Sequence, residues 1–252
     1  MTSAIYPSLK NRVVVVTGGG SGIGAAITEG FARQGARVVF IDYADEESIA
    51  LERRLSEMKP APVYRRCDLT EIDRLQLCLA GIADTVGPID ILVNNAANDD
   101  RHWLEDVTPD YWDDRIAVNL RHFYFSAQAV APAMRKRGAG VILNLGSLSW
   151  HLGLAQLSIY ETAKAGIEGM TRALARELGP NGVRVACIVP GNVKTPRQMK
   201  WYGPEAEAEI VAAQSLRLRI EPRDVASLAM FLASDDARAI TGHEYMIDAG
   251  WR

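Results

Sequence analysis

The fold of this chain is decided by residues 12–24, RVVVVTGGGSGIG. The unbroken run of valines predicts a strand buried on both faces of a parallel sheet. After the glycines, apolar residues recur from Ile23 to Phe31 at the spacing of one buried helix face, and Gly35 is placed to end that helix. A strand, a tight glycine turn and an amphipathic helix together predict the first half of a βαβ unit.

Outward from this stretch, strands and helices alternate along the whole chain. The further strands are expected at residues 36–41, 63–67, 89–93, 140–145, 183–189 and 244–247. The longest helices are expected at residues 109–137 and 158–178, where Thr108-Pro109 starts one and Gly179-Pro180 stops the other. With no repeat and no linker in its 252 residues, the chain is predicted to be one α/β domain, a doubly wound parallel sheet of the Rossmann type.

Composition and charge exclude several classes of partner. The net charge of −3 disfavours nucleic acid and anionic membranes as partners. No apolar run reaches the roughly 18 residues that a bilayer span needs, and the N-terminus does not resemble a signal peptide, so a cytoplasmic protein is expected. Cys67, Cys78 and Cys187 lie far apart without metal-type spacing, which predicts reduced thiols and no metal site.

The glycine turn and one acid predict the cofactor. Glycines between a first strand and helix let the backbone approach a pyrophosphate, whose charge the helix N-terminus favours. Asp42 ends the second strand, 24 residues after Gly18, near the spacing of about 20 expected of an acid that binds the adenosine ribose. Its carboxylate would repel the 2′-phosphate of NADP, so NAD is predicted. The alternative is that Asp42 only closes a turn at the strand end.

The candidate chemistry lies in the second half of the chain. Tyr160 and Lys164 are four residues apart in a predicted helix and therefore share a face. Ser147 lies thirteen residues before Tyr160, just after the fifth strand, where its hydroxyl would face the same cleft. The tyrosine–lysine pair alone is weak evidence, because this spacing is common in helices.

These motifs follow one another in the order and spacing of the short-chain dehydrogenase/reductase family, which the whole chain resembles. The resemblance is carried by Gly18-x-x-x-Gly22-x-Gly24, Asn94-Asn95-Ala96-Ala97, Asn119, Ser147, Tyr160-x-x-x-Lys164 and Pro190-Gly191. It implies that Tyr160 is the general base toward a substrate hydroxyl. A tyrosine active near neutrality needs its pKa lowered by about 3, or about 4 kcal/mol, which one ammonium about 4 Å away can supply. Lys164 is the expected source of that charge.

The same resemblance assigns the remaining roles at the site. Ser147 would hold the substrate oxygen, and Asn119 would anchor a water that relays protons from Lys164. Asn94 would support the central strand and line the cofactor cleft. The full set of predicted cofactor-binding residues is Gly18, Ser21, Gly22, Ile23, Gly24, Asp42, Asp68, Leu69, Asn95, Tyr160, Lys164, Pro190, Val193 and Thr195.

Within the family, the sequence resembles the bacterial NAD-dependent aldose 1-dehydrogenases, the D-xylose 1-dehydrogenases among them. The resemblance lies in residues 98–102, 149–154, 160–170, 190–195 and 247–252. It implies that a hydride leaves the anomeric carbon of a cyclic monosaccharide, giving a lactone. A sugar site needs several hydrogen-bonding groups and an aromatic face. The predicted substrate residues are Asn98, Ser149, His151, Gln156 and Asn192, with Trp150 or Trp201 as the aromatic face. A backbone-satisfying histidine and a core or interface tryptophan are the competing interpretations of His151 and Trp150.

Some questions remain open at this point. Residues 192–220 follow the sixth strand and are predicted to form a substrate lid, with a short helix at 205–214. The alternatives for function are another enzyme of the family, such as a 3-oxoacyl-carrier-protein reductase or a polyol or hydroxysteroid dehydrogenase, and a catalytically silent NAD-binding protein. By resemblance a homotetramer or homodimer is expected, formed through the two long helices.

Overall fold

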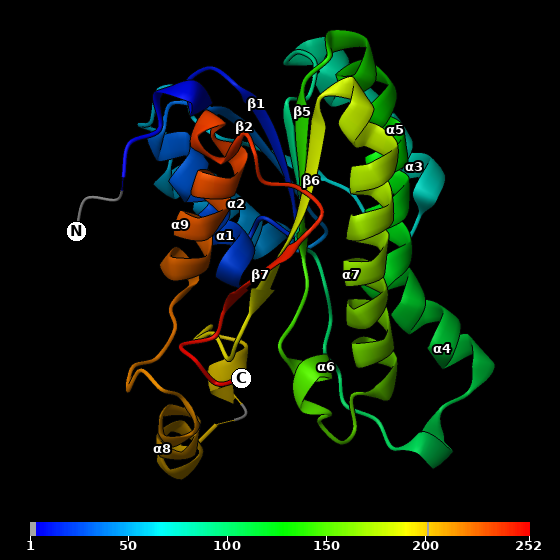
Figure 1. Ribbon diagram of the computed structural model, residues 1–252, viewed down its shortest axis with the longest axis vertical. Coiled ribbons are helices and arrows are strands. Elements are labelled where there is room, and N and C mark those ends of the chain that lie inside the picture. The colour runs from blue at the N-terminus through cyan, green and yellow to red at the C-terminus, as the bar shows by residue number, and fades with distance from the viewer. Residues whose placement is uncertain (1–3, 201) are drawn as a thin grey trace.

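A parallel sheet of seven strands forms the centre of the molecule in the computed structural model, which describes residues 4–200 and 202–252 (Figure 1). The strands are β1 (Val13–Thr17), β2 (Arg37–Asp42), β3 (Val63–Arg66), β4 (Ile91–Asn94), β5 (Gly140–Leu145), β6 (Val183–Pro190) and β7 (Glu244–Ile247). Their order is β3-β2-β1-β4-β5-β6-β7. The direction of the order reverses between β1 and β4, which defines a doubly wound sheet of the Rossmann type. The predicted fold class is confirmed.

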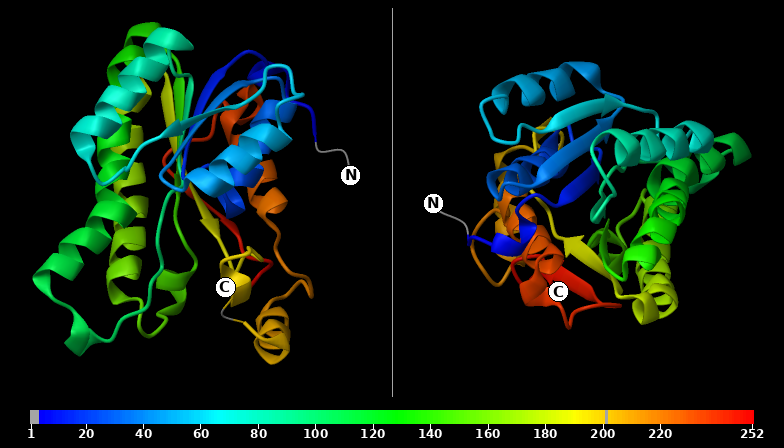
Figure 2. Two further views of the ribbon diagram at one scale, coloured as in Figure 1. Left: turned by 180° about the vertical axis from the view of Figure 1, so that it is seen from behind. Right: turned by 90° about the horizontal axis from the view of Figure 1, so that it is seen from above.

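Helices cover both faces of the sheet, so the domain has three layers (Figures 1 and 2). One layer contains α1 (Gly22–Arg33), α2 (Asp45–Arg54) and α9 (Pro222–Ala233). The other contains α3 (Ile72–Thr85), α5 (His122–Arg137) and α7 (Ser158–Leu178). Both faces of each central strand are therefore buried, which is why the strands are apolar at successive positions.

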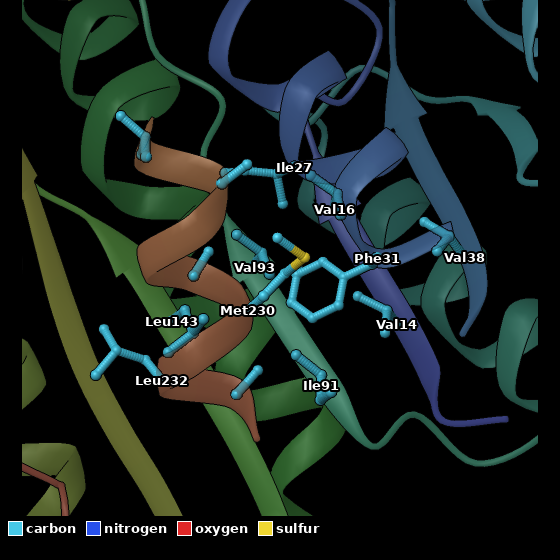
Figure 3. Packing of buried hydrophobic residues seen from close by; sticks show 14 of the residues in the cluster. Val14, Val16, Ile27, Phe31, Val38, Ile91, Val93, Leu143, Met230 and Leu232 are labelled. Atoms are coloured by element: carbon cyan, nitrogen blue, oxygen red, sulfur yellow. The ribbon is translucent and has the colours of Figure 1, made fainter. Parts of the chain in front are cut away.

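The strand β1 shows how one strand serves two cores. Val14 and Val16 face the α1–α9 layer, while Val13 and Val15 face the α3–α5–α7 layer, and all four are fully buried. In the first core, Phe31 of α1 and Met230 of α9 lie against each other over β1 and β4 (Figure 3). This packing fixes the start of α1 at the carboxyl end of β1.

The predicted long helix at residues 109–137 is interrupted. It consists of α4 (Pro109–Ile116), a π-helical turn (Ala117–Arg121) and α5. The Thr108 hydroxyl caps α4 by accepting a hydrogen bond from the Tyr111 amide at 3.2 Å. A π turn inside an α-helix often marks a functional position, and this one contains Asn119.

The carboxyl ends of the strands carry the longest excursions, α8 (Pro204–Ala213) and the short α6 (Ser149–Leu152), at the lower end of the molecule in Figure 1. A single bridge between Val193 and Ile220 closes the base of the excursion that contains α8. The helix predicted at 205–214 is thus present with its bounds shifted by one residue. Among the described residues, no helix is long and apolar enough to cross a membrane.

Candidate active site

The glycine turn after β1 is shaped by close backbone contacts. Gly18 has a φ of +61°, and a Cβ there would lie 2.7 Å from the Cα of Ala96. A Cβ on Gly24 would lie 1.9 Å from the carbonyl oxygen of Gly18, so the first turn of α1 packs directly on the loop. Only glycine allows both contacts. Their consequence is that the N-terminus of α1 opens directly onto the carboxyl edge of the sheet.

Asn95 and His122 hold this turn and its neighbouring loop in place. The Asn95 side chain donates to the carbonyls of Thr17 and Gly18, both at 3.0 Å. His122 is fully buried, and its Nε2 lies 3.1 Å from the Ala96 carbonyl, an arrangement that makes Nε2 the donor. Burial lowers the pKa of His122 to about 4, so its ring is neutral. Asn94, expected to line the cleft, instead lies fully buried beneath it, donating to Asn144 at 3.0 Å.

A cleft of about 490 Å³ runs along the carboxyl edge beside this loop. It contains every residue predicted to bind the cofactor except Val193, which lines an adjoining cavity. The N-cap residue of α1, Ser21, makes no side-chain cap, so the first amide N–H groups of the helix are available to an anionic group. The glycine loop, the helix start and an acid at the end of β2 fit a nicotinamide dinucleotide.

Asp42 closes the turn at the end of β2 and also lines the cleft. Its Oδ1 accepts hydrogen bonds from the amides of Tyr43 at 2.8 Å and Ala44 at 3.1 Å, as a turn carboxylate would. Its Oδ2 accepts from the Gly20 amide at 3.0 Å, which ties β2 to the glycine loop. The carboxylate also lines the cleft and retains lone pairs toward it. Asp42 thus shapes the loop and presents negative charge to the cleft.

Ser147 and Tyr160 meet where the cleft joins a second, smaller cavity. Both line this cavity of about 190 Å³, and Tyr160 also lines the cleft. The Ser149 amide donates to the Ser147 hydroxyl at 3.2 Å, and the two serine hydroxyls are 2.9 Å apart. These contacts fix the Ser147 oxygen just beyond the end of β5. The hydroxyls of Ser147 and Tyr160 can therefore both hydrogen-bond to one substrate oxygen.

Lys164 lies one helical turn beyond Tyr160 and is only 1% exposed. Its ammonium donates to the Leu145 carbonyl at 2.7 Å and lies 5.4 Å from the centroid of the Tyr160 ring. Burial lowers the pKa of Lys164 from 10.5 to about 8, and the negative charge of Asp99 opposes this shift. The lysine therefore carries its charge near neutrality at a considerable cost in desolvation.

The pKa of Tyr160 differs from the expectation. We expected Lys164 to bring it close to neutrality, but in this structure the pKa of Tyr160 is raised. Burial of the phenol is the largest cause, the charge of Asp99 adds to it, and Ser147 and Arg197 oppose it. The prediction of a lowered pKa is wrong for the protein alone, because desolvation of the phenolate outweighs the nearby positive charge.

Asn119 occupies the π turn and is fully buried. Its side-chain amide donates to the Asn98 carbonyl at 2.9 Å, and its Oδ1 accepts from the Asn98 amide at 2.8 Å. Asn119 therefore fixes the start of the loop after β4. Each of these two atoms makes one hydrogen bond and keeps a second donor or acceptor position, and the water-anchoring role stays a prediction.

Of the predicted substrate residues, the structure brings Ser149 and Asn192 to the smaller cavity and Asn98 to the cleft beside it. The other two predicted residues, His151 and Gln156, do not line the cavity or the cleft. His151 turns away, with Nε2 3.0 Å from Glu168 and Nδ1 against Arg252. Gln156 lines neither cavity.

Neither tryptophan suggested as the aromatic face can be placed in the cavity. The Trp150 indole donates to Glu168 at 2.8 Å and so joins His151 in a buried polar cluster. Trp201 lies outside the described residues. The aromatic ring that does line the cavity with Tyr202 is Trp251. Its position could have been suspected only from its place in the C-terminal stretch that carried the resemblance.

Sequence reasoning also missed two charged residues at the junction. Asp99 lines both the cleft and the cavity, and Arg197 lines the cleft. They form an ion pair of 3.1 Å between Arg197 Nη2 and Asp99 Oδ1. Among the described residues, no group of three or more potential ligands is arranged to hold a metal ion.

The fold and the site together define an oxidoreductase that uses a nicotinamide dinucleotide. Comparison with known proteins makes the class more specific. A family model described as enoyl-(acyl carrier protein) reductase matches residues 18–252. The D-xylose 1-dehydrogenase of Caulobacter vibrioides is 66% identical over 252 residues, which cover all of both chains. The probable galactose dehydrogenase GalD of Rhizobium meliloti is 43% identical, over 99% of this chain and 98% of its own.

A solved structure has the same fold. The crystal structure of gox2181 superposes with a TM-score of 0.89 at 30% identity, covering 97% of this chain and 98% of its own. The chain belongs to the short-chain dehydrogenase/reductase family.

Proposed function

We propose that this enzyme is an NAD-dependent aldose 1-dehydrogenase that oxidises D-xylose, or a similar pentose or hexose, to the lactone. The observation that carries the proposal is the 66% identity, over the full length of both chains, to the D-xylose 1-dehydrogenase of Caulobacter vibrioides. The 43% identity to a probable galactose dehydrogenase supports the same substrate class.

The smaller cavity supports a sugar as substrate. Its volume of about 190 Å³ lies below the range of about 300 to 1,000 Å³ typical of sites for drug-sized ligands, which suits a monosaccharide. Ser149, Asn192 and Tyr202 supply hydrogen-bonding groups, and Trp251 supplies an aromatic ring. Such a mixture favours a ligand with many hydroxyls and apolar C–H faces.

In the proposed mechanism, Tyr160 and Ser147 act on the anomeric hydroxyl. Ser147 hydrogen-bonds the substrate oxygen, and the Tyr160 oxygen receives the hydroxyl proton as the C–O bond becomes a carbonyl. The oxidised nicotinamide, when bound, supplies the acceptor for the hydride that leaves the anomeric carbon. Tyr160 must be a phenolate before it takes this proton, and Lys164 contributes positive charge that favours the phenolate form. Ser149 keeps the Ser147 hydroxyl oriented throughout.

NAD rather than NADP is part of the proposal. The Asp42 carboxylate faces the cleft, and its neighbours Tyr43 and Ala44 carry no positive charge. A 2′-phosphate placed beside this carboxylate would be repelled, whereas ribose hydroxyls would donate hydrogen bonds to it.

The lid and the assembly also belong to this proposal. Residues 192–220 act as the lid, since Asn192, Val193 and Tyr202 already line the substrate cavity. A homodimer or homotetramer forms through α5 and α7. Half-exposed Trp112 and Tyr124, on the neighbouring α4 and on α5, support an interface there. Light scattering coupled to size-exclusion chromatography gives the number of subunits.

The test is NADH formation from NAD with D-xylose, L-arabinose, D-galactose and D-glucose, with NADP in parallel and Tyr160→Phe as the inactive control. Turnover of a pentose or hexose with NAD, well above that with NADP, is the expected result. If no aldose is oxidised while the protein still binds NADH, the aldose assignment is wrong. Reduction of a 3-oxoacyl thioester would then point to the acyl reductases of the family.

A further inference from the structure

Asp99 places a carboxylate where the cofactor cleft and the substrate cavity meet. It is the one acidic residue among the described residues that line the cavity, and it shares the junction with Tyr160. Its side chain is 31% exposed, so its carboxylate remains accessible from the cavity. A carboxylate is a strong acceptor for hydroxyl donors, and hydrogen bonds to charged groups are stronger than neutral ones.

The Asp99 carboxylate is held in one orientation from the opposite side of the cleft. Gln198 donates to Oδ2 at 2.9 Å, and Arg197 pairs with Oδ1 at 3.1 Å. Arg197 also donates to Asn98 Oδ1 at 2.8 Å and Asp100 Oδ1 at 2.9 Å, which anchors the loop after β4 on both sides of Asp99. Each Asp99 oxygen retains lone pairs for a ligand.

We propose that Asp99 is a substrate-binding residue that accepts hydrogen bonds from ring hydroxyls of the aldose other than the anomeric one. This inference rests on the proposed function. Since Asp99 lies beside Tyr160, a sugar whose anomeric hydroxyl meets Tyr160 and Ser147 has neighbouring hydroxyls within reach of the carboxylate. Arg197 and Gln198 position Asp99 and, through it, the sugar.

The proposal has an electrostatic consequence at Tyr160. Lys164 from the same helix lies 5.4 Å from the Tyr160 ring, and Ser147 after β5, Asp99 after β4 and Arg197 after β6 also act on this phenol. Arg101 lines the same cavity. The charge of Asp99 raises the pKa of Tyr160, and that of Arg197 lowers it. Neutralising Asp99 therefore lowers the pKa of Tyr160, and the rise of kcat/KM with pH moves to lower pH.

The test compares Asp99→Asn with Asp100→Asn, a neighbour that pairs with Arg197 equally well but lines neither cavity. We expect Asp99→Asn to lower kcat/KM for D-xylose by about 10- to 100-fold with an unchanged KM for NAD, the range of a hydrogen bond to a charged group. Asp100→Asn should change it less than threefold or so. Both variants should retain the thermal stability of the wild type to within a few degrees.

Deoxy sugars give the decisive readout. For the wild type, kcat/KM should be lower with the 2-, 3- or 4-deoxy-xylose that lacks the bonded hydroxyl than with D-xylose, by the same factor as the Asp99→Asn substitution costs. For Asp99→Asn, kcat/KM should be the same with that deoxy sugar as with D-xylose. If all three deoxy sugars lose equally with both proteins, or if the two variants behave alike, Asp99 only supports the loop and the proposal is wrong. A wild type that oxidises no aldose overturns the proposed function as well, so the two failures are distinguishable.

Discussion

Replacing Lys164 with Met should stabilise the fold near neutral pH and abolish turnover. The ammonium is 1% exposed, and burial lowers its pKa from 10.5 to about 8. Between these values the unfolded chain binds more protons than the folded one, so the stability of the wild type rises as pH rises through this window. Below it, the charged lysine costs about 3 kcal/mol, at about 1.4 kcal/mol per pH unit.

Methionine fills a similar volume without charge, but it leaves the Leu145 carbonyl without the donor now at 2.7 Å. That loss costs about 1 to 3 kcal/mol, so the net gain at about pH 7 is about 0 to 2 kcal/mol. The advantage of Lys164→Met over the wild type should then fall by about 3 kcal/mol from about pH 7 to about pH 11.

Denaturant unfolding of both proteins at intervals across this pH range measures the difference directly, because other titrating groups are common to both. Lys10, which is exposed, is replaced by Met as the matched control. A difference between Lys164→Met and the wild type that stays constant with pH would refute the reasoning. It would mean that Lys164 is solvated in the native protein.

Four further predictions test the rest of the site. Tyr160→Phe should lower kcat by at least about 100-fold while NADH affinity, measured by fluorescence titration, stays within about twofold; retained turnover would show that another group accepts the proton. Asp42→Asn should reduce the ratio of kcat/KM with NAD to kcat/KM with NADP by at least about tenfold. An unchanged ratio would mean that Asp42 only closes the turn and does not select the cofactor. The folded pKa of His122 lies below the unfolded one, so the wild type should lose about 3 kcal/mol of unfolding free energy as pH falls from 6.5 to about 4. His122→Asn should not show this loss, and unfolding free energies that fall in parallel for both proteins would contradict the prediction. Trp251→Ala should raise the KM for the aldose about tenfold without changing that for NAD, and equal rises would indicate a general loss of structure.

The features that the sequence predicted correctly are local. Runs of valine and isoleucine mark strands buried on both faces, because a parallel sheet leaves neither face in water. The glycine turn needs contacts that only glycine permits, at Gly18 and Gly24. Tyr160 and Lys164 share a helix face by spacing alone, and Ser147 follows a strand whose end must lie at the carboxyl edge. Each of these follows from periodicity or from sheet topology.

The substrate side could not be predicted in the same way, because the side chains of a one-turn helix point in different directions around its axis. The helix α6 has four residues, and one turn distributes them around its axis. Ser149 faces the cavity, whereas Trp150 and His151 turn to the buried Glu168. All three residue types suit a sugar site, but Trp150 and His151 are turned away by a partner 18 and 17 residues further along the chain. Pairs such as Asp99 and Arg197 are separated still further and leave no local signal.

The electrostatics of Tyr160 illustrate a second limit. A Coulomb estimate from the Tyr160–Lys164 spacing yields a lowered pKa, because it counts an attraction and omits the solvent that both groups lose. In the folded protein, burial raises the pKa of Tyr160 and lowers that of Lys164, so both effects disfavour the charged pair. Burial sets the direction of the shift at Tyr160, while Asp99 from the loop after β4 adds to it and Arg197 from the loop after β6 opposes it. The spacing of a motif identifies which groups can exchange a proton, but the surrounding fold sets the pH at which they do so.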